Sequence, residues 1–206
     1  MTKVIFATHN EGKMREIREI MKDLNIELYS LKDAGINIDI EENGTSFEEN
    51  AIIKARTICN MTGEIVLADD SGLEVDYLDK APGIYSARFL GEDTPYSIKN
   101  QYILDKLKNV EGERRSARFV CVIACAFPDG KIITRKGIIE GYIAEKMSGS
   151  NGFGYDPIFY VPEYDCTTAD MPSELKNRIS HRAKALKAMK TVLINHISEE
   201  DSGARQ

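Results

Sequence analysis

Two adjacent carboxylates follow a short apolar run and form the strongest candidate for chemistry in this sequence. Asp69 and Asp70 come directly after residues 65–68, which are typical of a buried strand, and Ser71 and Gly72 follow them. Ligand sites in α/β proteins collect at strand ends. Adjacent carboxylates repel each other, so burying both requires a proton or a cation, and a divalent metal suits paired oxygen ligands. The same spacing fits a solvated acidic turn equally well.

A second candidate is the polar turn at residues 8–13, which lies between a predicted strand at 3–7 and a predicted helix at 12–24. A strand, a short turn with glycine and lysine, and a helix start can hold phosphate on backbone N–H groups. The turn is not a Walker A loop, because the first glycine and the hydroxyl residue after Lys13 are missing. An ordinary turn with a solvated lysine is the alternative.

Further acids lie in the polar loop after a predicted strand at 26–31. Glu41 and Glu42 could be metal ligands, or they could belong to a charged surface loop. The loop ends where Ser46 and Glu49 form a capping-box pattern, which predicts the start of a helix that Gly63 ends.

Two later segments could bind a nucleotide. Residues 148–157 are rich in glycine but contain Phe153, Tyr155 and Asp156, and an aromatic face could stack on a base. A long connecting loop is an equal alternative. Near the C-terminus, a continuous helix would point Lys176, His181 and Arg182 in three directions, so we expect a break with Ser180 capping a new helix. That break places His181 and Arg182 in a first turn, which favours an anion.

Composition and periodicity define the elements that must position these residues. The 206 residues are 42% hydrophobic with a net charge of −6, which fits one globular domain and argues against general nucleic-acid binding. No apolar run approaches a membrane span, and the N-terminus leads directly into a strand, so we expect a cytoplasmic protein without membrane partners. Residues 119–127 and 131–143 predict a hairpin around Pro128-Asp129-Gly130, which makes the sheet of this α/β fold mixed.

Taken together in order, these motifs resemble those of the Ham1/inosine triphosphate pyrophosphatase family. The resemblance runs from Val4 to about Leu193, and its motifs are Thr8-His9-Asn10-Glu11-Gly12-Lys13, Ser46-Phe47-Glu48-Glu49-Asn50-Ala51, Ala68-Asp69-Asp70-Ser71-Gly72-Leu73, Ala81-Pro82-Gly83-Ile84-Tyr85-Ser86-Ala87-Arg88, Phe153-Gly154-Tyr155-Asp156-Pro157 and Ser180-His181-Arg182. The resemblance implies a two-lobed α/β domain over residues 1–197, with a long mixed sheet flanked by helices and the active site in the cleft between lobes. Residues 198–206 are expected to be a polar, flexible tail.

The implied activity is hydrolysis of the non-canonical purine nucleoside triphosphates ITP, dITP and XTP to the monophosphate and pyrophosphate, which cleanses the nucleotide pool. The implied cofactor is Mg²⁺, with Mn²⁺ able to substitute, and the implied assembly is a homodimer. Asp70 corresponds to the general base, and Glu41, Glu42, Asp69 and Asp70 to the magnesium-holding region. The residues that correspond to the substrate-binding set are Thr8, His9, Asn10, Glu11, Gly12, Lys13, Ser71, Phe153, Gly154, Tyr155, Asp156, Lys176, His181 and Arg182.

The sequence departs from the family pattern at His9, where the family usually has glycine. A side chain there could narrow the phosphate loop or add a hydrogen bond. Two other functions fit some of the same motifs. One is a phosphatase with a nucleophilic aspartate, which would release orthophosphate, and the other is a nucleotide-binding regulator without catalysis.

Overall fold

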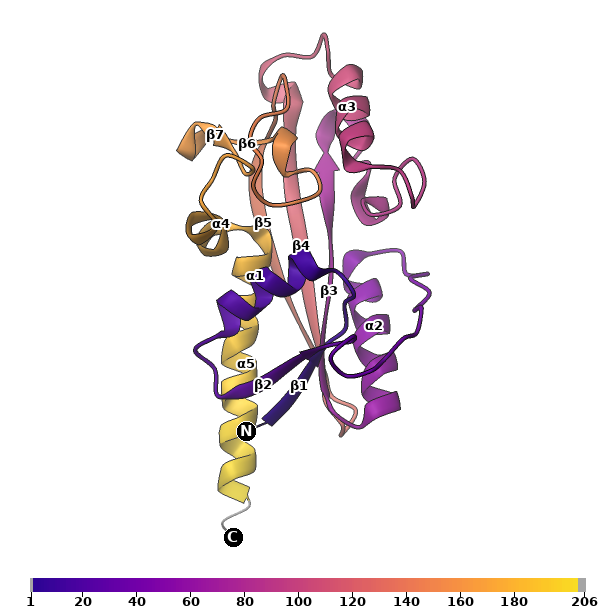
Figure 1. Cartoon of the computed structure of the whole chain (residues 1–206), viewed down its shortest axis with the longest axis vertical. Coiled ribbons are helices and arrows are strands. Elements are labelled where there is room, and N and C mark those ends of the chain that lie inside the picture. The colour runs from indigo at the N-terminus through magenta and orange to yellow at the C-terminus, as the bar shows by residue number, and fades with distance from the viewer. Residues whose placement is uncertain (1, 204–206) are drawn as a thin grey trace. The chain divides into compact units, whose positions relative to one another are not determined.

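The computed structural model describes residues 2–203, in which a mixed sheet is flanked by helices (Figure 1). Within this range the strands are β1 (Thr2–Phe6), β2 (Ile26–Ser30), β3 (Ile65–Val75), β4 (Ser116–Ala126), β5 (Ile132–Ile143), β6 (Phe159–Val161) and β7 (Cys166–Thr167). The helices are α1 (Glu11–Met21), α2 (Phe47–Thr62), α3 (Tyr96–Lys106), α4 (Ser173–Ile179) and α5 (His181–Gly203).

The strands follow the order β2-β1-β3-β4-β5-β6-β7 across the sheet. Strand β1 pairs in parallel with β2 and with β3, whereas β6 pairs antiparallel with β5 and with β7. Parallel neighbours need crossover connections, and α1 and α2 supply them for the first three strands. The prediction of an α/β fold with a mixed sheet is confirmed.

The chain divides into two compact units. Unit 1 contains Met1–Asp70, Cys121–Gly137 and Arg182–Gln206, and unit 2 contains Ser71–Val120 and Ile138–His181. Strands β3, β4 and β5 therefore contribute residues to both units. An active site in a cleft between lobes stays a prediction from the family resemblance.

Unit 1 buries the apolar faces of α1 and α5 against β1, β3 and β4. The sequence period of α1 places Met14, Ile17 and Met21 in this core, as predicted. From β1, the alternating residues Val4 and Phe6 join the same core. The remaining members include Leu67, Cys121, Ile123, Leu186, Met189 and Leu193.

Local capping signals fix helix α2 at both ends. The Ser46 hydroxyl accepts the Glu49 N–H at 3.1 Å, and Gly63 ends the helix with a left-handed φ of +69°. The Glu49 carboxylate accepts the backbone N–H of Thr45 at 2.6 Å. These caps are local in sequence, and both predicted ends of the helix are confirmed.

Unit 2 has its own core, which combines α3 and β6 with residues 73–75 of β3, 117–119 of β4 and 139–143 of β5. Arg115 is nearly buried and joins two of these elements. Its guanidinium donates to the carbonyls of Leu107 and Val110, just after α3, and of Ile143 and Ala144, at the end of β5. The Arg115 guanidinium thus links the segment after α3 to the end of β5 through four backbone carbonyls.

The predicted hairpin and helix break are both present. The Phe127 N–H donates to the Lys131 carbonyl at 2.9 Å, which closes the turn between β4 and β5. Ser180 has extended backbone with ψ of 159° and separates α4 from α5. Helix α5 continues to Gly203, so the predicted tail is helical as far as it is described, and residues 204–206 lie outside the described residues. None of the described helices combines the length and apolar character that crossing a bilayer takes.

Candidate active site

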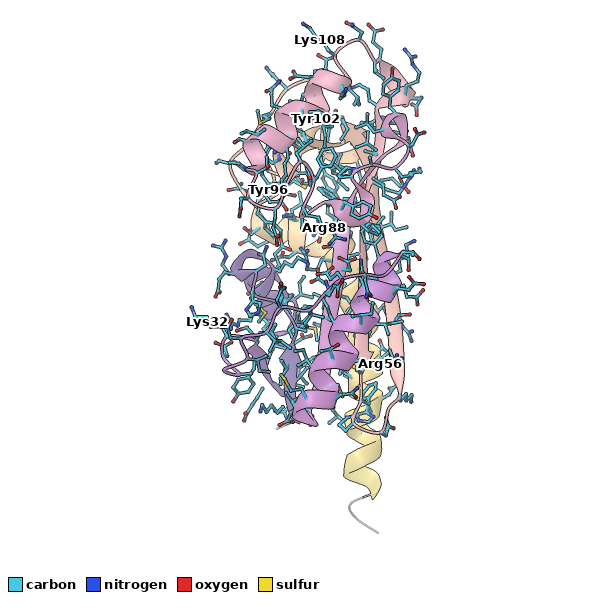
Figure 2. The ribbon with its side chains drawn as sticks, turned by 90° about the vertical axis from the view of Figure 1, so that its right-hand side faces the viewer. Lys32, Arg56, Arg88, Tyr96, Tyr102 and Lys108 are labelled. Atoms are coloured by element: carbon cyan, nitrogen blue, oxygen red, sulfur yellow. The ribbon has the colours of Figure 1, made fainter. Side chains whose placement is uncertain are left out.

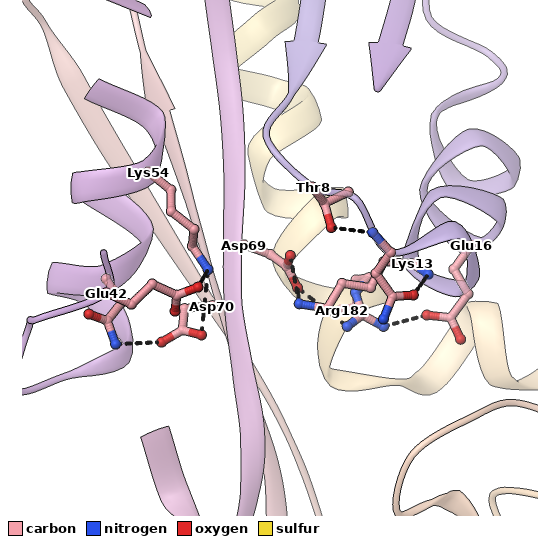
Figure 3. Close-up of polar contacts among 10 residues, drawn as sticks. Thr8, Lys13, Glu16, Glu42, Lys54, Asp69, Asp70 and Arg182 are labelled. Carbon is pink, nitrogen blue, oxygen red and sulfur yellow. Dashed lines mark hydrogen bonds and ion pairs between the residues drawn. The ribbon is translucent and has the colours of Figure 1, made fainter. Parts of the chain in front are cut away.

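Asp69 and Asp70 lie in the middle of β3, and their side chains point to opposite faces of the strand (Figure 3). Both are buried, at 1% and 6% exposure. The expectation that the strand ends before these acids is wrong, because β3 continues to Val75. Each carboxylate has its own cationic partners. The strand can therefore continue past Asp69 and Asp70, because the two buried charges need not share a single counterion.

Asp69 faces α1 and α5, from which two cations reach it. The Lys13 ammonium lies 3.0 Å from its carboxylate, and the Arg182 guanidinium lies 3.3 Å from Oδ2. Arg182 is 2% exposed and also donates to Glu16, so a buried network of two cations and two carboxylates forms. Burial alone raises the pKa of Asp69, but the charges of Lys13 and Arg182 outweigh it and hold the pKa below its ordinary range.

Asp70 faces helix α2 instead. Its Oδ2 accepts the Asn50 side-chain amide at 3.1 Å, and the Lys54 ammonium lies 3.7 Å from Oδ1. Burial raises the pKa of Asp70 to about 6, although Lys54 and the bond from Asn50 oppose the rise, and the nearby charge of Glu42 adds to it. A carboxylate with this pKa can accept a proton near neutral pH.

Lys54 joins Asp70 to Glu42, whose Oε1 lies 3.1 Å from the ammonium. The sequence did not single out Asn50 and Lys54 as site residues. A signal was present, because they lie four residues apart on α2 and each directly precedes a member of its apolar face, Ala51 or Ala55. Asn50 and Lys54 border the buried apolar face of α2, and both are themselves buried in contact with Asp70.

The donor set around Lys54 bears on the predicted magnesium. In the described residues, no three acidic, histidine or cysteine side chains gather closely enough to hold a metal ion. However, oxygens of Glu42 and Asp70 converge on one ammonium, whereas Glu41 is exposed and Asp69 faces the other side of β3. Two carboxylates are a common protein contribution to Mg²⁺, which takes its other ligands from water and substrate phosphates. Glu42 and Asp70 therefore fit such an ion.

The predicted phosphate turn leads from β1 into α1 and is braced by its own side chains. The Asn10 side chain accepts the Lys13 N–H at 3.0 Å, and Thr8 Oγ1 accepts the Asn10 N–H at 3.1 Å. Helix α1 starts at Glu11, so the N–H groups of Glu11 and Gly12 lie in the first turn, before any intrahelical acceptor. This geometry suits an anion at the helix start.

His9 lies within this turn and is exposed. Its Nε2 lies 3.4 Å from the Ile38 carbonyl, so the side chain contacts the loop that follows β2. It also helps to line a cavity of about 150 Å³ within unit 1. The residues around that cavity are Ala7, Thr8, His9, Lys13, Leu31, Ile38, Asp39, Ile40, Glu42, Lys54 and Asp69. The departure at His9 thus adds a side chain to the cavity wall beside Lys13.

In unit 2, Asp156 organises the predicted base-binding loop. Its Oδ2 accepts the Phe153 N–H at 2.8 Å and the Lys176 ammonium at 2.6 Å, and its Oδ1 accepts Thr168 Oγ1 at 2.8 Å. The same ammonium lies 4.9 Å from the centre of the Phe153 ring. Gly152 has a φ of +74°, and a Cβ there would lie 2.1 Å from Asp156 Oδ2, so glycine is required.

Three other predicted residues of unit 2 differ in accessibility. Ser71 is half-buried in β3. His181 is buried and stacks on Phe119, with ring centres 4.8 Å apart. Tyr155 is 3% exposed and donates its hydroxyl to the Ser86 carbonyl at 2.8 Å, so its side chain belongs to the core of unit 2. Any contact of Tyr155 with a ligand is left to its backbone.

A protein-family model described as the Ham1 family matches residues 4–192. The chain belongs to the Ham1 family. Individual relatives of this chain are named dITP/XTP pyrophosphatase. The protein from Clostridium perfringens is 51% identical over 196 residues, covering 92% of this chain and 96% of the relative. The one from Bacillus subtilis is 46% identical, covering 94% of this chain and 98% of the relative.

Solved structures of Ham1 proteins share the fold. The HAM1 protein from Coxiella burnetii superposes with a TM-score of 0.86 at 41% identity, covering 95% of this chain and 100% of that chain. The Ham1 protein from Staphylococcus aureus gives a TM-score of 0.84 at 40% identity with the same coverage. These matches confirm the α/β architecture and the family resemblance found in the sequence.

The Ham1 motifs are divided between the two units. Unit 1 holds Thr8, His9, Asn10, Glu11, Gly12, Lys13, Glu41, Glu42, Asp69, Asp70 and Arg182, and unit 2 holds Ser71, Phe153, Gly154, Tyr155, Asp156, Lys176 and His181. Two boundaries between units cut a motif, between Asp70 and Ser71 and between His181 and Arg182. The roles of all these residues in substrate binding and catalysis stay predictions.

Proposed function

We propose that this chain hydrolyses the non-canonical purine nucleoside triphosphates ITP, dITP and XTP to the nucleoside monophosphate and pyrophosphate. The observation that carries the proposal is the similarity, over more than nine-tenths of both chains, to relatives named dITP/XTP pyrophosphatase. The structure adds buried acidic and basic side chains beside a helix start, which suit the hydrolysis of a phosphoanhydride.

Asp70 is the proposed general base. Its raised pKa, about 6, allows it to accept a proton near neutral pH, and Asn50 and Lys54 fix the orientation of its carboxylate. A water molecule that donates a proton to Asp70 becomes a better nucleophile. Its attack on phosphorus breaks the bond between the α- and β-phosphates. The Asn50 amide nitrogen donates to Oδ2 of Asp70 and fixes that oxygen, while the carboxylate can still accept the proton from water.

The turn at residues 8–13 is proposed to bind the phosphates. Charge builds up on the departing pyrophosphate, and cations already in place stabilise it without reorganisation. Lys13 fits this role because its ammonium is anchored to Asp69 and lines the cavity of unit 1. Asp69 is paired with both Lys13 and Arg182, and these two side chains provide the positive charge on this side of β3.

We further propose Mg²⁺ as the cofactor, with Mn²⁺ able to substitute. Glu42 and Asp70 would hold it, together with substrate phosphates, and Glu41 is the less suitable neighbour because it is exposed. Bound there, the ion would polarise phosphate oxygens and neutralise their charge. Lys54, which now joins the two carboxylates, would have to give way or share them.

The family resemblance also supports a homodimer, and the sequence supports a cytoplasmic enzyme without nucleic-acid or membrane partners. Light scattering would test the assembly, with a mass near twice 23.1 kDa expected. A mass of one chain at all protein concentrations would contradict it.

The test of the proposed function follows the products formed from ITP. Wild-type protein, Asp70→Asn and the control Asp129→Asn, at an exposed position in the turn between β4 and β5, are incubated with Mg²⁺, with Mn²⁺ or with excess EDTA. We expect IMP and pyrophosphate from the wild type and the control with either metal, and no turnover in EDTA. Asp70→Asn should lose at least ~10²-fold in kcat. Orthophosphate as the first product would favour a phosphatase, and nucleotide binding without turnover would favour a regulator.

A further inference from the structure

Asn100 on helix α3 reaches the predicted base-binding loop, although no motif in the sequence singled it out. Its side-chain nitrogen donates to the Gly154 carbonyl at 3.1 Å, across 54 residues of sequence. The side chain is 2% exposed. Among the described residues its other polar atom, Oδ1, is buried and has no hydrogen-bond partner.

With only one of its two polar atoms hydrogen-bonded, the side-chain amide of Asn100 contributes little to the free energy of unfolding. One hydrogen bond is gained, but a buried acceptor is left unpaired, and the cost of an unpaired acceptor equals or exceeds the gain from one bond. An apolar side chain of the same shape, such as leucine, would fill the space without leaving an acceptor unpaired. The selective value of Asn100 must therefore come from what its single hydrogen bond holds.

That bond holds the peptide between Gly154 and Tyr155. In a trans peptide the carbonyl and the following N–H point in opposite directions, so fixing the Gly154 carbonyl toward α3 aims the Tyr155 N–H away from it. Gly154 has a φ of +70°, and the Tyr96 ring lies 3.6 Å from where a Cβ would be. Tyr96 projects from the first turn of α3 (Figure 2) and meets the Tyr155 ring edge to face at 5.2 Å.

Lys99, the neighbour of Asn100 on α3, holds a second loop. It is 1% exposed, donates to the Ala87 carbonyl, and lies 4.9 Å from the centre of the Tyr96 ring. Burial lowers its pKa. The loop held by Lys99 also includes Ser86, whose carbonyl accepts the Tyr155 hydroxyl at 2.8 Å. Helix α3 thus fixes the loop of residues 86–87 and the base-binding loop to each other.

We propose that Asn100 is a positioning residue for base selectivity, which it sets by fixing the orientation of the Gly154–Tyr155 peptide. The proposal rests on the proposed function, because the loop it holds is the one that would receive the purine. A backbone N–H aimed at the ligand favours the 6-oxo edge of hypoxanthine or xanthine over the 6-amino edge of adenine. If this peptide can rotate, that preference is weakened while the catalytic side chains of unit 1 are unchanged.

The test compares Asn100→Leu with Gln101→Leu, which also replaces a side-chain amide by leucine, at the next, exposed position of α3. For Asn100→Leu we expect the ratio of kcat/KM for ITP over ATP to fall about tenfold, through a higher KM for ITP with kcat within about twofold. The thermal midpoint should be equal to or above that of the wild type. Gln101→Leu should change neither the ratio nor KM.

Binding of the products IMP and AMP, measured by calorimetry, gives a second readout that needs no turnover, and the preference for IMP should fall by a similar factor. Asn100→Asp, which keeps the shape and the acceptor but cannot donate to Gly154, should behave like Asn100→Leu in both readouts.

An unchanged ITP to ATP ratio and an unchanged IMP preference would overturn the positioning role. A lower midpoint with equal losses on both nucleotides would assign Asn100 to stability instead. If the wild type bound IMP but released no pyrophosphate from ITP, the proposed function would fail, and the IMP preference would still decide the role of Asn100.

Discussion

The environment of Asp70 predicts that Asp70→Asn stabilises the metal-free protein at neutral pH while removing its turnover. Asp70 is 6% exposed, and burial raises its pKa from 3.8 to about 6 against the opposing charge of Lys54. At 1.36 kcal/mol for each pKa unit, the ionised carboxylate costs the folded state about 3 kcal/mol at pH 7. Asparagine keeps the shape and the acceptor for Asn50 but carries no charge.

The sign of the pH dependence follows from the direction of the pKa change. The pKa of Asp70 is higher in the folded state, so the folded protein binds more protons than the unfolded chain between about pH 4 and pH 6. Its stability therefore falls as the pH rises through this window. At pH 4 Asp70 is neutral in the folded state and only about half ionised in the unfolded chain, so the advantage of Asp70→Asn should shrink to less than about 1 kcal/mol.

Urea and thermal unfolding in EDTA, at pH 4 and pH 7.5, would measure this effect. For a chain of this size, a gain of about 3 kcal/mol raises the thermal midpoint by roughly 6–12 °C. Asp129→Asn is the matched control, because it removes the same charge from an exposed position of unit 1, keeps an acceptor for the Lys131 N–H, and should change stability by less than about 0.5 kcal/mol. A variant less stable than the wild type at pH 7.5, or an equal gain at both pH values, would refute the reasoning.

Three further predictions concern the neighbours of this carboxylate. Asp69→Asn should have the opposite effect on stability, a loss of about 3–5 kcal/mol by urea unfolding, because it leaves the buried charge of Arg182 and the partly buried charge of Lys13 without their shared partner. Lys54→Met should move the acidic limb of the pH profile of kcat/KM to higher pH, because the Lys54 charge lowers the pKa of Asp70, and an unmoved limb would exclude this coupling. Lys13→Ala should chiefly raise KM for ITP, since a phosphate contact made in the ground state contributes to binding. Unchanged KM and kcat would leave Lys13 with only its structural ion pair.

The sequence predicted best those features whose causes are local. Ser46 and Gly63 define the ends of α2 through hydrogen bonds within a few residues, and Ser180 separates α4 from α5 in the same way. Asn10 is an unrecognised member of this class, because its side chain caps α1, which starts at Glu11, one residue before the predicted start at Gly12.

Features that depend on distant partners were predicted less well. The strand at Asp69 and Asp70 was expected to end because two acids interrupt an apolar run. It continues because Lys13 and Arg182 neutralise one face, while Asn50 and Lys54 meet the other. These partners are 16 to 113 residues away in the sequence, as the pairs Lys54–Asp70 and Arg182–Asp69 illustrate, so no window of the sequence contains them.

The same limit applies to the base-binding loop. The sequence offered the aromatic side chains of this glycine-rich loop as faces for a base, and the family resemblance implied that Tyr155 binds substrate, which stays a prediction. Its ring is buried against Tyr96, and its hydroxyl is used by Ser86. Asn100 was missed because an asparagine in an amphipathic helix usually faces solvent, and only the folded chain brings it to Gly154.

The most direct test of the central claim measures pyrophosphate release from ITP, XTP and ATP side by side with Mg²⁺ present. We expect IMP or XMP and pyrophosphate as products, with kcat/KM for ITP and XTP roughly 10²-fold or more above that for ATP. The factor follows because two mismatched buried hydrogen bonds cost about 1–3 kcal/mol each. Comparable kcat/KM for ATP and ITP, or orthophosphate in place of pyrophosphate, would contradict it.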